Sequence, residues 1–99
     1  MKLQNFRFLL DEIDNELFEI LTTRFAIIRD LGRYKKKRVI DVYQPLREKE
    51  MLVSRKETAK KLGLSEVFIG DFFRLIFRES RRIQSDKTYH SEKSNFDNL

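Results

Sequence analysis

Apolar residues follow a helical stride along the first third of the chain. They recur at alternating intervals of four and three residues, which is the spacing of one face of an α-helix. The members of this apolar stripe are Phe6, Leu10, Ile13, Leu17, Ile20, Ile27 and Leu31. Helical periodicity is unbroken from about residue 3 to about residue 38, which predicts a single helix about 50 Å long. Such a rod is too long for a compact monomer of 99 residues.

Two shorter helices are expected after the long one. Pro45 suits the first turn of a second helix, predicted over about residues 46–62, and Gly63 would end it because glycine adopts a left-handed cap without steric cost. Ser65 is a good N-cap for a third helix, predicted over about residues 66–84. The pattern therefore predicts an all-α fold with three helices per chain, one of them very long.

The composition excludes several classes of protein. The chain has 99 residues, no cysteine and a single histidine, His90, so it can form neither a disulfide nor a thiolate or histidine zinc site, and no metal is expected. No apolar run is long enough for a signal peptide or for the roughly 20 residues of a membrane span, and we expect a cytoplasmic protein. We expect one domain over residues 1–86 and a polar, flexible tail over residues 87–99.

A cation interrupts the apolar stripe. The position that the stride requires between Ile20 and Ile27 is 24, and it holds arginine. Arg24 can snorkel to solvent or pair with a carboxylate across a helix interface. Lys35 returns to within about 20° of the direction of Arg24, about 16 Å along the axis, so the two side chains could instead bracket a small anion. Gly32 lies close to the same face, where it indicates either a frayed helix end or room for a ligand, and we expect the second.

Polar residues also interrupt the apolar line of the third helix. Ser80 and Gln84 stand one turn apart in this line, so we expect both to occupy buried positions. The apolar members of the line are Ile69, Phe73 and Ile76.

The remaining charged residues have simple structural explanations. Glu48 lies in the first turn of the second helix, where the helix dipole favours an acid, and its neighbour Arg47 is most simply a solvated residue. The basic runs at 35–37 and 81–82 are also expected to be solvated, apart from Lys35. The net charge of +5 suggests an anionic partner, which could be a nucleic acid, a membrane surface or a small acid.

Arg7 cannot share a small ligand with Arg24 of its own chain, because about 25 Å of helix separates them. It could do so from another chain. If two copies of the long helix pack antiparallel, Arg7 of one subunit lies beside Arg24 of the other, and a symmetric dimer has two equivalent composite sites. By itself, Arg7 is more simply a surface residue.

The set of separated polar residues resembles the all-α chorismate mutase family over residues 3–85. The resemblance is carried by the segments "FRFLLDEIDNELFEILTTRFAIIRDLGRYK", "QPLREKEML" and "FRLIFRESRRIQ". The matching positions are Arg7, Arg24, Gly32, Lys35, Arg47, Glu48, Ser80 and Gln84. The match is specific because these residues are spread over three helices and do not form one short string.

This resemblance implies an intertwined homodimer that rearranges chorismate to prephenate, in the branch of the shikimate pathway toward phenylalanine and tyrosine, without a cofactor. Carried over position by position, Arg24 and Arg7 of the partner subunit would hold a substrate carboxylate. Ser80 and Arg47 would help at the ring carboxylate.

The resemblance also implies the residues that act on the reacting bond. Lys35 and Gln84 would donate hydrogen bonds to the ether oxygen, where negative charge grows as the C–O bond breaks, and Lys35 would contribute most. Glu48 would accept the ring hydroxyl. Gln44 stands just before "PLRE", where an acidic residue is common, so the chain departs from the family pattern at a secondary contact to the hydroxyl.

Two other functions are compatible with the sequence. Isochorismate pyruvate lyase uses the same fold and similar carboxylate-binding cations, but Glu48 and Ser80 favour the mutase. A basic helical module that binds nucleic acid would use the charge of +5 and the segment "GRYKKKR". The cations are matched by "DEIDNE" and spread over all helices, with no recognisable recognition helix, so the mutase is the preferred hypothesis.

Overall fold

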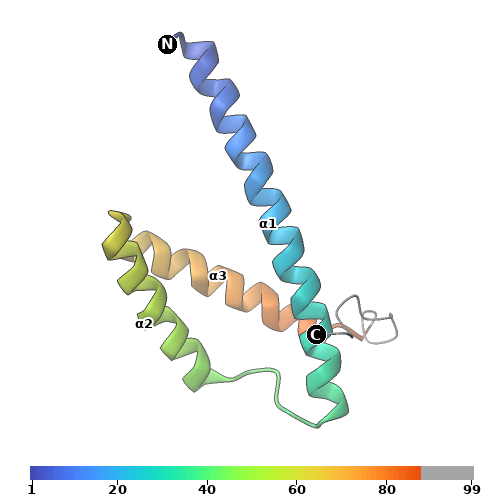
Figure 1. Ribbon diagram of the computed structural model, residues 1–99. Coiled ribbons are helices and arrows are strands. Elements are labelled where there is room, and N and C mark those ends of the chain that lie inside the picture. The colour runs from blue at the N-terminus through green and yellow to red at the C-terminus, as the bar shows by residue number, and fades with distance from the viewer. Residues whose placement is uncertain (88–99) are drawn as a thin grey trace.

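The computed structural model describes residues 1–87, which form three helices joined by short connections (Figure 1). The helices are α1 (Leu3–Lys37), α2 (Pro45–Leu62) and α3 (Glu66–Ser85). No strand occurs among the described residues, so the predicted all-α fold and its three helices are confirmed. The predicted flexible tail lies, from residue 88 onward, outside the described residues.

The boundaries of α2 and α3 follow the local signals in the sequence. Pro45 is the first residue of α2, and Gly63 ends that helix with a φ of 73°, a left-handed conformation that glycine adopts without strain. The Ser65 hydroxyl accepts a hydrogen bond from the backbone amide of Phe68 at 3.1 Å, which caps the start of α3. The predicted start and stop signals are therefore confirmed.

The turn after α1 folds back over the last turn of the helix. The backbone amide of Ile40 donates to the carbonyl of Lys35 at 2.8 Å, which closes the end of α1. Between them in this turn, Val39 has a φ of 56°, a conformation that disfavours β-branched side chains. The turn returns the chain toward the Lys35 side chain.

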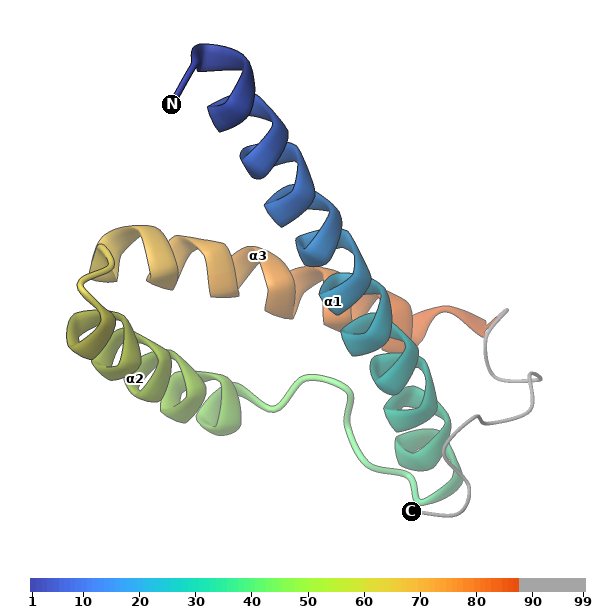
Figure 2. The ribbon, with the colours of Figure 1, turned by 45° about the horizontal axis from the view of Figure 1, so that its top comes forward.

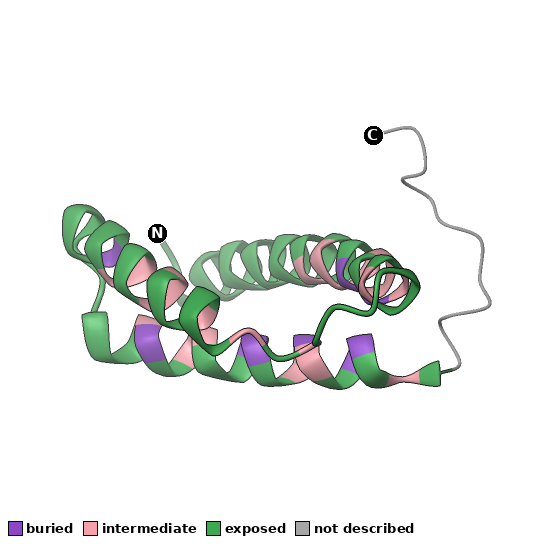
Figure 3. Ribbon diagram, turned by 90° about the horizontal axis from the view of Figure 1, so that it is seen from below, coloured by how far each residue is buried: buried purple, intermediate pink, exposed green. Residues whose placement is uncertain are grey.

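Helix α3 connects the fold, because it packs against both α1 and α2. Figures 1 and 2 show α2 and α3 as a helical hairpin and α1 crossing near the C-terminal end of α3. The molecule is elongated, with principal extents of 54 × 29 × 23 Å. The buried apolar residues are Ile28, Ala59, Ile76, Phe77 and Ile83. Three of these five belong to α3, on the face turned toward the other helices (Figure 3).

The N-terminal half of α1 has no cover within the described chain. Every residue from 1 to 20 is exposed, and Figure 3 shows this half in the colour of exposed residues throughout. The apolar stripe lies open here: Leu17 is 48% exposed and Ile20 is 64% exposed. A contiguous apolar surface of this kind marks an interaction site. Among the described residues, no helix has the length and hydropathy needed to cross a membrane.

Candidate active site

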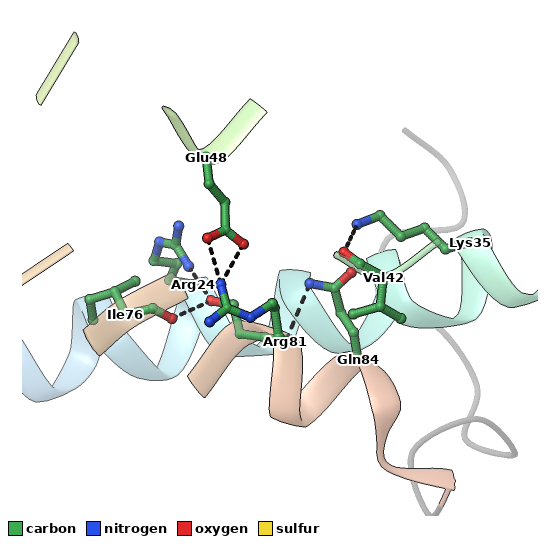
Figure 4. A network of polar contacts seen from close by, with 8 residues as sticks. Arg24, Lys35, Val42, Glu48, Ile76, Arg81 and Gln84 are labelled. Atoms are coloured by element: carbon green, nitrogen blue, oxygen red, sulfur yellow. Dashed lines mark hydrogen bonds and ion pairs between the residues drawn. The ribbon is translucent and has the colours of Figure 1, made fainter. Parts of the chain in front are cut away.

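Arg24 meets Ser80 where α1 crosses α3. Arg24 Nη1 donates a hydrogen bond to the Ser80 hydroxyl at 2.9 Å, and that hydroxyl donates to the carbonyl of Ile76 at 2.7 Å (Figure 4). Ser80 is buried, as the interrupted apolar line of α3 predicted. The structure thus brings together two of the predicted site residues that are far apart in the sequence.

The Arg24 guanidinium is partly buried and lacks an acidic partner within residues 1–87. Burial lowers the pKa of Arg24 from its ordinary value, and the positive charge of Arg55 lowers it further. Arg55 lies on α2, with its guanidinium 5.7 Å from the centre of the Phe73 ring. Two cations therefore approach each other here, an arrangement that an anionic ligand would relieve.

Lys35 lies in the last turn of α1 and its side chain reaches the connection that leads to α2. Its Nζ donates a hydrogen bond to the Val42 carbonyl at 3.0 Å (Figure 4). Burial lowers the pKa of Lys35 below its ordinary value, while the nearby Glu48 carboxylate opposes this by raising the pKa. Because an ammonium group carries three N–H donors, the contact with Val42 leaves others for a ligand.

Gly32 does not provide room for a ligand, so that expectation from the sequence is wrong. A Cβ added at Gly32 would lie 2.9 Å from the Cα of Gln84 and 3.0 Å from its carbonyl oxygen. Glycine is needed because the backbones of α1 and α3 approach closely at this point. Gln84 is buried, as predicted, and its Nε2 donates to the Ser80 carbonyl at 3.2 Å.

Glu48 reaches from the first turn of α2 toward α3. Arg81 Nη1 donates to both carboxylate oxygens of Glu48, at 2.5 and 2.6 Å (Figure 4). The side chains of Arg81 and Glu48 are 32% and 18% exposed. The expectation that both arginines at 81–82 are solvated is therefore wrong for Arg81, because its partner Glu48 lies on another helix.

Two predicted site residues, and Gln44 at the position that departs from the family pattern, are not brought into contact with this group. Arg47 and Arg7 are exposed, and neither makes a hydrogen bond or ion pair within residues 1–87. Arg7 lies on the uncovered half of α1, so its predicted role requires a second chain. Gln44 donates from Nε2 to the carbonyl of Asp41 at 2.8 Å, a local contact before α2.

Open hollows border these residues on two sides. A hollow of about 510 Å³ is lined by Glu19, Ile20, Thr23, Arg24 and Ile27. All of these residues belong to α1, so the hollow has no second wall within the described residues. A larger hollow, of about 660 Å³, lies between α2 and α3, and its lining includes Tyr43, Glu48 and Arg81. The site is consequently open on the side of α1.

The arrangement suits the binding of a small anion with several polar groups. Arg24 and Lys35 supply positive charge, Ser80 and Gln84 supply polar groups from the facing helix, and Glu48 supplies an acceptor. Within residues 1–87, no three acidic or histidine side chains gather in a way that could hold a metal ion. The chemistry available from these side chains is electrostatic binding and hydrogen bonding.

Comparisons with known proteins identify the family of the chain. The profile of the chorismate mutase type II family matches residues 6–85. A protein named T-protein from Enterobacter agglomerans is 32% identical over 80 residues, which cover 81% of this chain and 21% of that protein. A T-protein from Haemophilus influenzae is 33% identical over 78 residues, covering 79% of this chain and 21% of that protein. The chain thus spans about a fifth of the length of these relatives, and no solved structure matches it. Since the family profile extends over nearly all of the three helices, the chain belongs to the chorismate mutase type II family.

Proposed function

We propose that this chain catalyses the rearrangement of chorismate to prephenate, as a cytoplasmic step toward phenylalanine and tyrosine. The observation that carries the proposal is the contact of Arg24 on α1 with Ser80 on α3, with Gln84 buried one turn beyond Ser80 and Lys35 partly buried in the last turn of α1. Arg24, Ser80 and Gln84 lie where α1 and α3 pack together, a place where apolar residues would stabilise the fold more. A role in binding a ligand accounts for their placement.

The positions of these polar residues along α1 and α3 suggest a role for each in binding chorismate. Arg24, with Arg7 of the partner subunit, would bind a carboxylate of chorismate, and Ser80, which contacts Arg24 at 2.9 Å, would help at the ring carboxylate. Lys35 and Gln84, further along the crossing, would donate to the ether oxygen. Glu48 would accept the ring hydroxyl, and Arg47 would have to turn inward to assist at the ring carboxylate.

The proposed reaction needs positioning and charge more than acid or base chemistry. Chorismate is a flexible dianion, and holding it in a compact, chair-like form removes conformational freedom before the reaction begins. As the C–O bond breaks, negative charge grows on the ether oxygen. Donors fixed at that oxygen bind the transition state more tightly than the ground state, and each contributes roughly 10²- to 10³-fold in rate.

The site would be completed by a second copy of the chain. The exposed N-terminal half of α1 carries the apolar stripe, and each half-exposed side chain would contribute on the order of 1 kcal/mol when covered. The hollow beside Arg24 is open on the same helix. A partner chain that packs on α1 would therefore cover the apolar stripe and also supply the second wall of the hollow.

The antiparallel pairing that brings Arg7 of the partner subunit to Arg24 also matches the apolar stripe. A twofold axis would then pass near the middle of the segment between these residues, at about residue 15 or 16. With that axis, Ile13 of one chain would lie beside Leu17 and Phe18 of the other. The alignment of the two arginines and the burial of the stripe are thus satisfied by one register.

A turnover assay tests the proposal directly. Purified protein would be incubated with chorismate and, in parallel, with isochorismate, and the products prephenate and salicylate would be measured. We expect prephenate from chorismate, from a protein that elutes as a dimer in size-exclusion chromatography. Salicylate from isochorismate without prephenate would identify a lyase instead, and activity from a stable monomer would reject the composite site.

A further inference from the structure

The Glu48 carboxylate is held by a residue outside the predicted site. Arg81 Nη1 lies almost equally far from its two oxygens, at 2.5 and 2.6 Å. The pair bridges α2 and α3, and both side chains are mostly shielded from solvent. A charge-assisted contact to both oxygens restricts the carboxylate more than a single hydrogen bond would.

Arg81 is itself fixed on a second side. Its guanidinium lies 5.0 Å from the centre of the Tyr43 ring, in the connection that leads into α2. On α3 it directly follows Ser80, and it precedes Gln84 by less than one turn, so it borders the face that carries both residues. Arg82, the next residue, instead pairs with Glu79 on the exposed surface of the same helix.

Glu48 can still accept a hydrogen bond from a ligand while it is paired with Arg81. A carboxylate has about four acceptor positions, and Arg81 approaches from one nitrogen only, so each oxygen can accept a further hydrogen bond. Glu48 also acts electrostatically on Lys35, whose predicted target is the ether oxygen. Fixing this one carboxylate therefore affects two of the predicted contacts to chorismate.

We propose that Arg81 is a positioning residue, which holds the Glu48 carboxylate in the orientation that accepts the ring hydroxyl of the substrate. This inference rests on the proposed mutase function. It assigns Arg81 no contact with the reacting atoms; the effect of Arg81 passes through Glu48.

A double-mutant cycle on turnover tests this role. The wild type is compared with Arg81→Gln, Glu48→Gln and the double variant, using initial rates of prephenate formation to obtain kcat and KM separately. We expect Arg81→Gln to lower kcat/KM about tenfold, and to change it less than twofold once Glu48 is already glutamine. Arg81→Lys, which keeps the charge but not the planar guanidinium, should recover part of the loss.

Matched controls separate positioning from a general effect on folding. Arg82→Gln removes a neighbouring arginine with an exposed ion pair, and we expect less than a twofold change in kcat/KM. Circular dichroism and thermal unfolding of each variant establish that the folded fraction is unchanged at the assay temperature. An Arg81→Gln protein as active as Arg82→Gln, or one that loses the same factor with and without Glu48, would overturn the role of Arg81 alone. A folded, dimeric wild type that forms no prephenate would overturn the proposed function, and the role of Arg81 with it.

Discussion

The close approach of α1 and α3 at Gly32 gives a sharp test of the site geometry. In Gly32→Ala the added Cβ would lie 2.9 Å from the Cα of Gln84 and 3.0 Å from its carbonyl oxygen. Since carbon atoms in contact prefer about 3.5–4.0 Å, the two backbones must separate by roughly 0.5–1 Å. Neither atom belongs to a flexible side chain that could rotate away.

Two opposing effects decide the sign of the change in stability. Alanine stabilises a helix interior by about 1 kcal/mol relative to glycine. Overpacking a close contact costs typically about 1–3 kcal/mol, and here the clash is with backbone atoms. We therefore expect Gly32→Ala to be destabilised by on the order of 1 kcal/mol, measured as a lower midpoint of thermal or urea unfolding. Because the same separation moves Gln84, kcat/KM for chorismate should fall as much as about 10²-fold.

Gly70→Ala is the matched control for this substitution. It also lies inside a helix, but its new Cβ would meet the Cε atom of Lys56, at 2.7 Å. That atom is near the end of a flexible side chain and can move aside. We expect Gly70→Ala to be as stable as the wild type or more stable by up to about 1 kcal/mol, with unchanged activity. If Gly32→Ala behaves in the same way, the close contact between α1 and Gln84 does not exist.

Three further outcomes follow from the proposed site. Lys35→Ala should retain its helical circular dichroism while prephenate formation drops by roughly 10²-fold or more, and near-normal turnover would contradict the role of Lys35. Because burial lowers the pKa of Lys35, kcat/KM should decline as the pH rises through a value below the ordinary pKa of a lysine; a pH profile flat up to that ordinary value would argue against a protonated Lys35 in the reaction. When inactive Arg7→Ala and Lys35→Ala proteins are mixed and refolded, heterodimers should regain one intact site and measurable turnover, and inactive heterodimers, verified by differential tagging, would exclude sites shared between subunits.

The helices could be predicted because their determinants are local. The four-three stride, Pro45, Gly63 and Ser65 each act within a few residues of the boundary they define. The burial of Ser80 and Gln84 could also be predicted, since they continue an apolar line on one helix. The left-handed conformation of Val39 could not be predicted in this way, because the closure of the turn at Ile40 overrides the local preference of a β-branched residue.

The contacts between helices could not be predicted in the same way. Gly32 lies against Gln84 because α1 crosses α3 at this point. The sequence does not specify the distance between two crossing helices. Arg81 and Arg82 are adjacent and chemically identical, yet only Arg81 faces Glu48 of α2. Which of two neighbouring arginines reaches a site depends on a rotation of about 100° per residue and on the placement of another helix.

In the proposed dimer, the position of Arg24 would connect the binding of ligand to the assembly of the protein. Within the described residues its charge is partly buried, has no acidic partner and lies near the like charge of Arg55, so the empty site is electrostatically unfavourable. Arg7 of the partner subunit would add a third cation. In the proposed dimer, association driven by the apolar stripe would therefore work against repulsion at the site, and a bound dianion would remove that repulsion. At a ligand concentration of 100 times Kd, chorismate or a stable dianionic analogue should consequently stabilise the proposed dimer by about 2.7 kcal/mol of free energy per site. The expected readouts are a lower dimer dissociation constant and a higher unfolding temperature.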